Sequence, residues 1–402
     1  MPLIQRGALK GCYLPDYAGG SIINLLSSII RSRGGRSPHR ELAGLSANSL
    51  GTTQKVIYLL IDGLGEGQLR RFIAAGGGKA FLAVRKRRTI TTVFPATTAA
   101  AVTTFASGAS PAEHAVLGWH LHLPDLGLVS TILPATTKTG APMAGEAFDL
   151  RRYLSLPSHL ATTKCKRALL SWGAIPNSRF SKAGGSWNWR SAYTTLQGLE
   201  KQIAGFVRRP GRAVAYAYWP DYDTFCHGYG CDHAKTVRHL RQIDEALARI
   251  AHRLEGTNAM LIVTADHGLV DTPPKRCLEL REVKGLYDCL AMIPSGDARQ
   301  TQCFVRPAKV AKFLAIVRQL APFCVCIPGE ELLAMGVFGP GKPHSALANR
   351  VGDFVLLARD GCAIAATPTT MESRFNLASH GGMSPAEVLV PLYVVPPGRA
   401  AS

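Results

Sequence analysis

The sequence lacks the features of several classes of protein. Its most apolar run, residues 21–30, is too short to span a bilayer. The N-terminus has no charged segment leading into an apolar stretch with a cleavage site. The ten cysteines are scattered without the paired spacing of a disulfide framework or a zinc ribbon. These absences argue against a membrane-spanning or disulfide-stabilised protein, and we expect a cytoplasmic protein with reduced cysteines.

Acidic residues are also scarce, because 27 Asp and Glu stand against 46 Lys and Arg, for a formal net charge of +19. Such a surface attracts anions: nucleic acid, anionic lipid or phosphorylated small molecules. A binding protein for nucleic acid or a membrane surface is therefore one hypothesis, which the basic run at 85–88 also supports. With 402 residues, 47% of them hydrophobic, the chain has the composition of a globular protein of one large domain or two.

Apolar runs of strand length alternate with helical segments along most of the chain. Strands are predicted at 56–61, 90–94, 169–175, 213–218, 259–264, 354–358 and 388–395. Helices are predicted at 68–75, within 93–108, and at 191–208 and 234–254. The alternation predicts an α/β fold, a doubly wound and mostly parallel sheet with helices on both faces.

The predicted domain organisation has four parts. Residues 1–54 form an N-terminal arm with a short helix at 21–31 and a basic, solvated loop at 31–40. The main domain covers 55–395, and 396–402 form a C-terminal tail. A strand, helix and strand at 302–306, 307–320 and 323–327 predict a small inserted α+β subdomain at about 285–345. The segment 116–164 is expected to form loops and small strands along one side of a cleft.

The stretch VFPATTAAAVTTFASG, from Val93 to Gly108, places Thr98 where a strand stops and a helix of small residues starts. A hydroxyl at that position faces unpaired backbone N–H groups and the positive end of the helix dipole. It is therefore suited to hold an anion such as phosphate. Threonine is also a common N-cap, so this stretch alone does not distinguish capping from catalysis.

Acidic residues and histidines follow several other predicted strands. These are Asp62, Asp223, Asp266 and His267, with His227 four residues after Asp223 and His380 in a glycine-rich loop. Ligands of a doubly wound sheet bind beyond the carboxyl ends of the strands, so we expect these side chains to converge with Thr98. Singly, each could be a helix cap or a structural histidine. Together they suffice for two divalent ions, and mixed His and Asp ligands suit zinc or manganese better than calcium.

The segments that carry these residues form an ordered set. They are IDG at 61–63, VFPATT at 93–98, PDYDTFCHGYG at 220–230, TADHG at 264–268 and SHGG at 379–382. In this order and spacing they resemble the nucleotide pyrophosphatase/phosphodiesterase branch of the alkaline phosphatase superfamily. The resemblance extends over about residues 56–395 and implies an alkaline-phosphatase-like fold. It also implies a hydrolase that cleaves phosphodiester or pyrophosphate bonds in nucleotide-like substrates.

Residue roles follow from the resemblance, motif by motif. One metal ion would be bound by Asp62, Asp266, His267 and Thr98, and the other by Asp223, His227 and His380. Zinc is the expected ion, with manganese as the alternative, and no organic cofactor is implied. Thr98 would be the catalytic nucleophile and form a phospho-threonine intermediate. Thr97 and Asp221 stay open as alternatives to Thr98 and Asp223, and the absence of a Cys-x-Pro-x-Arg stretch disfavours the sulfatase relatives.

Trp119 departs from the family pattern. Eukaryotic-type members have an Asn there, just after the residues matched by His114 and Gly118, which contacts a phosphate oxygen. That contact must then come from elsewhere, for example the backbone N–H of Ala99, while Trp119 either stacks on a planar leaving group or packs in a wall. The alternatives are a phosphomonoesterase or phosphonate hydrolase of the same superfamily or, in a different class, a basic binding protein with a degenerate metal site.

Overall fold

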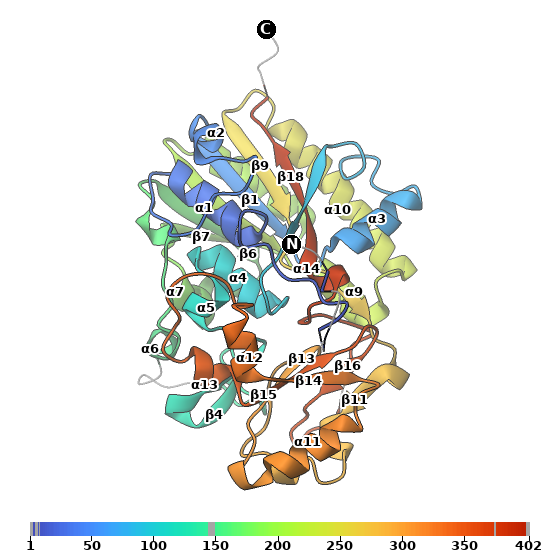
Figure 1. Cartoon of the computed structure of the whole chain (residues 1–402). Helices are drawn as coiled ribbons and strands as arrows, with labels where there is room; N and C mark the ends of the chain where they lie inside the picture. The colour runs from blue at the N-terminus through green and yellow to red at the C-terminus, as the bar shows by residue number, and fades with distance from the viewer. Residues whose placement is uncertain (1–2, 5–6, 8, 144–148, 374, 399–402) are drawn as a thin grey trace.

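The computed structural model describes residues 3–4, 7, 9–143, 149–373 and 375–398 (Figure 1). Its main sheet has seven strands in the order β2-β18-β9-β1-β8-β6-β7. Their bounds are β1 Lys55–Ile61, β2 Arg87–Thr91, β6 Lys166–Trp172, β7 Trp189–Tyr193, β8 Ala213–Trp219, β9 Ala259–Thr264 and β18 Leu389–Val395. β18 pairs antiparallel with β2 and β9, and the other pairings in this sheet are parallel. The prediction of a mostly parallel α/β sheet is confirmed.

Strand β1 lies at the centre of the main sheet because its whole sequence, KVIYLLI, is apolar except for the first residue. Every residue of β1 is buried, as expected for a parallel strand covered on both faces. β1 pairs with β8 on one side and β9 on the other, so that Ile61 lies beside Trp219 and Leu60 beside Thr264. The residues that follow these three strands therefore leave the sheet at neighbouring points.

Helices cover both faces of the main sheet. Figure 1 shows α1 and α4 on one side of the sheet and α3 and α10 on the other. The helices are α1 Ile22–Ser32, α2 Ala47–Gly51, α3 Glu66–Ala74, α4 Thr98–Ser107, α5 Pro111–His114, α6 Leu150–Leu154, α7 Arg179–Gly184, α8 Leu196–Arg208, α9 Asp221–Tyr229, α10 Ala234–Arg253, α11 Val310–Arg318, α12 Gly329–Ala334, α13 Leu347–Val351 and α14 Pro385–Val388. None of the helices in the described ranges is both long and apolar enough to cross a membrane.

A second sheet lies below the main sheet in Figure 1, and its strand order is β14-β15-β13-β12-β3-β4-β5. It joins two distant parts of the chain. The bounds are β3 His120–Leu123, β4 Leu128–Thr131, β5 Thr136–Thr137, β12 Ser295–Asp297, β13 Gln300–Cys303, β14 Cys324–Pro328 and β15 Phe354–Ala358. Two small pairs, β10 Val270–Asp271 with β17 Ala378–Ser379 and β11 Cys277–Glu279 with β16 Ala363–Ala365, complete the strands described.

The structure adds detail to the predicted elements. The strand expected at 90–94 occupies Arg87–Thr91, and the helix expected at 191–208 is preceded by the short strand β7. Helix α1 lies in the main hydrophobic core, with Ile22, Leu25 and Ile29 fully buried. The solvated loop expected at 31–40 is wrong for Arg33 and His39, which are buried. The domain boundaries at 54, 285, 345 and 395 stay predictions.

A buried ion pair connects the two sheets. Arg299, between β12 and β13, donates through Nε and Nη2 to the two carboxylate oxygens of Glu387 in α14, at 2.8 and 2.9 Å. Its Nη1 donates to the carbonyls of Arg359 and Cys362. Both side chains are almost completely inaccessible to solvent. Glu387 also accepts a 2.7 Å hydrogen bond from the backbone N–H of Gly382, so the pair fixes the loop that carries His380.

We expect Arg299→Met to lower the free energy of unfolding by about 3–5 kcal/mol, because it leaves the buried Glu387 carboxylate without its counter-ion. Urea unfolding followed by circular dichroism measures this change. Arg151→Met is the matched control, because its pair with Asp149 is exposed to solvent and should leave the unfolding midpoint unchanged. Equal midpoints for both variants would contradict the assigned role of Arg299.

Candidate active site

The candidate residues come together at the carboxyl edge of the main sheet. Asp62 follows β1, and the Asp266-His267 pair follows β9. Asp223 and His227 lie one turn apart on α9, directly after β8, and His380 follows β17. Thr98 is the first residue of α4. Because β1, β8 and β9 are neighbours in the sheet, these side chains meet although they are spread over most of the chain.

Thr98 contacts the first group of side chains. Its Oγ1 lies 3.0 Å from Nε2 of His267. The same nitrogen lies 3.4 Å from Asp62 Oδ1 and 3.6 Å from Asp266 Oδ2. At the start of α4, Thr98 and Ala99 also have backbone N–H groups without an intrahelical acceptor. A hydroxyl and a cluster of ligating atoms therefore lie together at the start of α4.

Asp223 and His380 lie next to this group. Asp223 lies 3.1 Å from Nε2 of His227 and 4.0 Å from Nε2 of His380. The rings of His267 and His380 stack with centroids 3.8 Å apart. Nδ1 of His227 lies 2.6 Å from the carbonyl oxygen of Ala378, which orients its other nitrogen toward Asp223.

Two sets of ligating atoms in this region are close enough to bind an ion. They are Asp62, Asp266 and His267, and Asp223, His267 and His380, each with atoms within 4.8 Å of one another. The first set has the protein ligands expected from the sequence beside Thr98. In the second set His267 occupies the place expected for His227, which instead contacts Asp223. Asp221 belongs to neither set.

Each of the three carboxylates has one oxygen bound by the protein and one without a hydrogen-bond partner in the described part of the chain. Asp266 Oδ1 accepts from the backbone N–H groups of Gly63 and His267, while Oδ2 is unpaired. Asp62 Oδ2 accepts from the Tyr218 hydroxyl, while Oδ1 is unpaired. Asp223 Oδ2 contacts Nε2 of His227, while Oδ1 is unpaired. Unpaired buried oxygens are costly, and divalent cations would satisfy them, so the residues fit a metal centre.

The pKa shifts of the site residues agree with a cation-binding site. Burial raises the pKa of Asp62 well above its ordinary value, and the carboxylates of Asp266 and Asp223 raise it further. Burial lowers the pKa of His380, and the neighbouring His267 adds to this effect. Burial alone would lower the pKa of His227, but the Asp223 carboxylate raises it to about 9. The protein thus concentrates buried negative charge where a cation would stabilise it.

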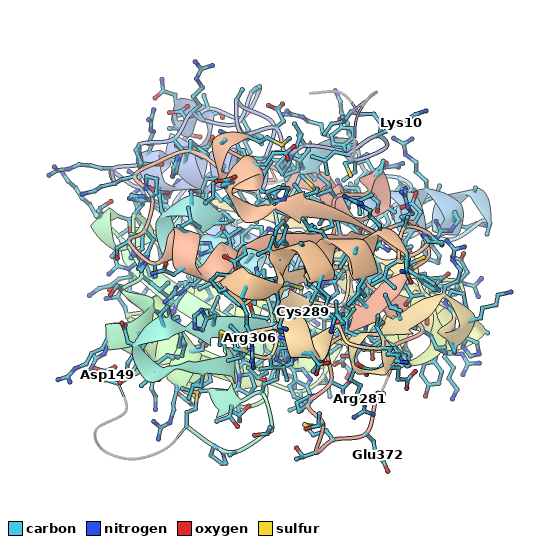
Figure 2. All side chains as sticks on the ribbon, turned by 60° about the horizontal axis from the view of Figure 1, so that its bottom comes forward. Lys10, Asp149, Arg281, Cys289, Arg306 and Glu372 are labelled. Atoms are coloured by element: carbon cyan, nitrogen blue, oxygen red, sulfur yellow. The ribbon has the colours of Figure 1, made fainter. Side chains whose placement is uncertain are left out.

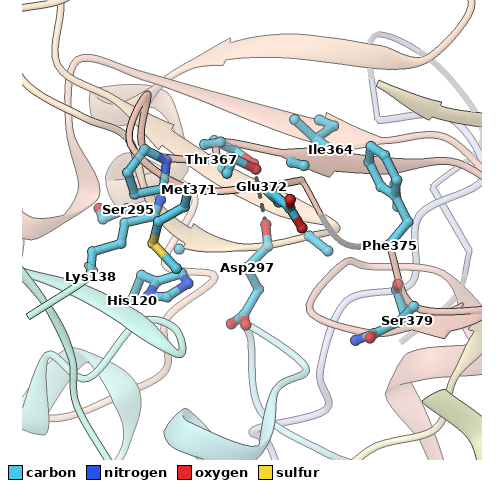
Figure 3. Close-up of a pocket in the computed structure, with 18 residues that line it drawn as sticks. His120, Lys138, Ser295, Asp297, Ile364, Thr367, Met371, Glu372, Phe375 and Ser379 are labelled. Atoms are coloured by element: carbon cyan, nitrogen blue, oxygen red, sulfur yellow. Dashed lines mark hydrogen bonds between the residues drawn. The ribbon is translucent and has the colours of Figure 1, made fainter. Parts of the chain in front are cut away.

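A pocket of about 590 Å³ borders the site on the side of the second sheet. Figure 3 shows Asp297 at the centre of its lining, with His120 and Lys138 on one side and Ser379, the residue before His380, on the other. Burial lowers the pKa of Lys138 to about 8, and its Nζ donates a 2.7 Å hydrogen bond to the carbonyl of Pro294. The pocket therefore has a cationic group, Lys138, on the side opposite Ser379.

Segment 368–373 forms another part of this pocket, and the Arg281 side chain holds it in place. The Arg281 guanidinium donates to the carbonyls of Pro368 and Met371 and to the hydroxyl of Ser373. Figure 2 shows Arg281 beside Glu372 at the rim of the molecule. The pocket wall is thus fixed by hydrogen bonds from the Arg281 side chain.

Sequence reasoning missed Asp297. It is half-buried beside the site, and its Oδ2 accepts a 3.0 Å hydrogen bond from the backbone N–H of Trp119. A Cβ placed on Gly381 would lie 2.9 Å from the Asp297 Cβ, so the two loops touch. Asp297 stands in the sequence PSGD, which is typical of a turn and gives no signal of a site. Trp119 itself is 37% exposed.

The mostly parallel sheet, with this cluster beyond its carboxyl edge, defines an enzyme of the alkaline-phosphatase-like fold. The sequence model of the family "Type I phosphodiesterase / nucleotide pyrophosphatase" matches residues 56–383, and the chain belongs to this family. It is therefore a hydrolase of the class that cleaves phosphoesters. The resemblance noted in the sequence is confirmed.

Solved structures support the same fold. Murine ectonucleotide pyrophosphatase/phosphodiesterase 5 is 16% identical, with a TM-score of 0.65 over 84% of this chain and 87% of that one. Phosphonoacetate hydrolase from Sinorhizobium meliloti 1021, in complex with phosphonoformate, is 16% identical, with a TM-score of 0.62 over 86% of this chain and 91% of that one. No curated protein sequence matches the chain. At these identities the structures show the shared fold alone.

We expect Asp297→Asn to stabilise the metal-free protein at neutral pH. Burial raises the pKa of Asp297 from 3.8 to about 6, so the folded state favours the protonated carboxyl and loses stability as the pH rises through that range. The thermal midpoint of the variant should match wild type near pH 4 and exceed it at pH 7. Asp125→Asn, at an exposed position, should show no such trend. A constant difference across the pH range would contradict the prediction.

Proposed function

We propose that the protein is a metal-dependent hydrolase that cleaves phosphodiester or pyrophosphate bonds of nucleotide-like substrates through a phospho-threonine at Thr98. The observation that carries the proposal is the position of the Thr98 hydroxyl, 3.0 Å from His267, which belongs to both sets of ligating atoms. Thr97 is fully buried as the N-cap residue of α4, and its hydroxyl has no hydrogen-bond partner in the described part of the chain. This favours Thr98 over Thr97 as the nucleophile.

Two divalent ions fit the ligand sets. Asp62, Asp266 and His267 would hold one ion beside Thr98. Asp223 and His380 would hold the other together with His227, whose Nε2 already lies against Asp223. Mixed imidazole and carboxylate ligands favour zinc, with manganese as the alternative. When bound, such ions lower the pKa of a nearby hydroxyl and stabilise negative charge on the attacking and leaving oxygens.

The chain's own residues account for the course of the reaction. Thr98 Oγ, having released its proton to water, attacks phosphorus, and the bond from phosphorus to the leaving oxygen breaks. The free N–H groups at the start of α4 face the phosphoryl oxygens of the intermediate. Water then attacks phosphorus, the bond to Thr98 Oγ breaks, and the threonine is restored. The substrate gains the elements of one water molecule in total.

The substrate preference follows from what surrounds Thr98. A monoester brings two negative charges, and enzymes that prefer it usually add an arginine clamp or a further ion. The residues after Thr98 are small and apolar, from Ala99 to Val102. Trp119 offers an exposed flat surface that suits the base or another planar ester group. An inactive threonine-to-alanine form of the murine relative was solved in complex with AMP, which favours a nucleotide product here.

Lys138 supports a second candidate, a phosphonate hydrolase. Its half-buried ammonium group lines the pocket and would pair with a carboxylate carried by the substrate beside the phosphorus. The similar bacterial structures are complexes of phosphonoacetate hydrolase with phosphonoformate and with phosphonoacetate. Phosphonoacetate is therefore included below as a substrate.

We expect Thr98→Ala to remove at least a thousandfold of kcat, because it deletes the attacking oxygen, while the metal content stays within one equivalent of wild type. Thr97→Ala should reduce kcat less, because that hydroxyl has no hydrogen-bond partner among the described residues. Steady-state assays and elemental analysis of both proteins measure these effects. If Thr97→Ala were the more damaging change, the nucleophile would have to be reassigned to Thr97.

We expect kcat/KM for bis-p-nitrophenyl phosphate to exceed that for p-nitrophenyl phosphate by at least tenfold. Trp119→Asn should lower this ratio, because it removes the flat surface for the second ester group and supplies an amide for a phosphate oxygen. Activity on phosphonoacetate above both esters, lost in Lys138→Met, would select the second candidate. Monoester preference in the wild type would refute the first candidate, and lower activity on phosphonoacetate than on both esters would refute the second.

A further inference from the structure

Another cluster of possible metal ligands lies away from the candidate active site. It consists of His39, Glu113 and His159. Nε2 of His39 lies 2.8 Å from Glu113 Oε2, and Nε2 of His159 lies 3.2 Å from Glu113 Oε1. The two rings meet edge to face with centroids 5.6 Å apart. One ligating atom from each residue lies within 4.8 Å of the others. The residues come from the loop after α1, from α5 and from the segment after α6, so only the fold brings them together.

We propose that His39, Glu113 and His159 form a third metal site, of the zinc type, that fastens the N-terminal segment to α5, the helix that follows the one carrying Thr98. Two imidazoles and one carboxylate are a common zinc ligand set, which water completes to a tetrahedron. His39 and Glu113 are nearly inaccessible to solvent, whereas the His159 side chain is 22% exposed and leaves a path for an ion and its water. This inference does not rest on the proposed substrate or nucleophile.

The Glu113 carboxylate is held in a position that suits metal binding. Glu113 Oε2 accepts a 2.8 Å hydrogen bond from the backbone N–H of Ser110, as part of the capping box that starts α5. This bond fixes the carboxylate while Oε1 faces His159. The neighbouring loop packs tightly, because a Cβ on Gly341 would lie 2.4 Å from the carboxyl carbon of Glu113. Glu113 therefore cannot swing away from the two histidines without moving that loop.

The cluster lies at the far end of α4 from Thr98. Gly108 ends that helix with a left-handed φ of 75°, and a Cβ there would lie 2.4 Å from Ile30 and 3.4 Å from the Cβ of His159. His114, next to Glu113, contacts the Thr104 hydroxyl of α4 at 3.2 Å. At 1.5 Å per residue, ten residues of helix separate the cluster from Thr98 by about 15 Å. A cation here would also interact favourably with the negative end of the helix dipole.

Without a metal, the same geometry is a hydrogen-bonded clasp in which the Glu113 carboxylate contacts both imidazole rings. The two forms differ in composition, so metal counting separates them. We expect purified wild type, loaded with zinc and dialysed, to contain one equivalent more than His159→Gln. His252→Gln is the matched control, because His252 is exposed and contacts only Glu255 among the described residues. It should retain the wild-type content.

The difference of one equivalent is expected whatever the number of ions in the active site. The metal count therefore tests the third site independently of the proposed function. Equal zinc content in wild type and a folded His159→Gln would overturn the third site and leave the clasp.

A reciprocal variant keeps the proposal testable if His159→Gln does not fold. Asp223→Asn combined with Asp266→Asn removes two carboxylates of the candidate active site. We expect this protein to retain one equivalent of zinc and, after exchange for cobalt, the visible absorption of a cobalt ion with nitrogen and oxygen ligands. Complete loss of metal from the folded double variant would refute the third site.

Discussion

The contact on which the rest of the structure depends is the buried pair of Arg299 and Glu387. Arg299 belongs to the turn between two strands of the second sheet, and Glu387 to the helix that leads into the last strand of the main sheet. Through the N–H of Gly382 the same carboxylate holds the loop of His380, and Asp297 lies two residues before Arg299. One interaction thus sets the position of the second sheet, a candidate metal ligand and the edge of the pocket.

The parts of the fold that the sequence predicted are those with strong local signals. Runs such as VIYLLI and AVAYAY are typical of strands buried on both faces, and the long amphipathic pattern before Leu254 is typical of a helix. Strand β2 lies earlier in the sequence than predicted. Its sequence, RRTIT, is basic, and its burial depends on pairing with β18. The second sheet was not foreseen because its strands meet across more than a hundred residues, which no local pattern records.

The candidate site also contains some residues that the sequence predicted and others that it did not. Asp62, Asp223 and Asp266 were predictable because each follows an apolar strand, and parallel strands end at one edge. The contact of His267 with both ligand sets depends on the stacking against His380 and was not predictable from spacing. Asp297 and Arg299 gave no signal, since a single charged residue in a turn acquires its role only from long-range contacts.

The place of β18 has a consequence for how the enzyme is made. The strand partner of β2 in the main sheet is β18, which lies near the end of the chain, and the segment after β2 leads directly to Thr98. While the chain is still being synthesised, β2 has no strand to pair with, and the second sheet lacks four of its strands. Domains fold as their residues emerge, so the segment that leads to Thr98 lacks this strand partner until β18 has been made. The candidate active site therefore forms only after β18 has joined the sheet.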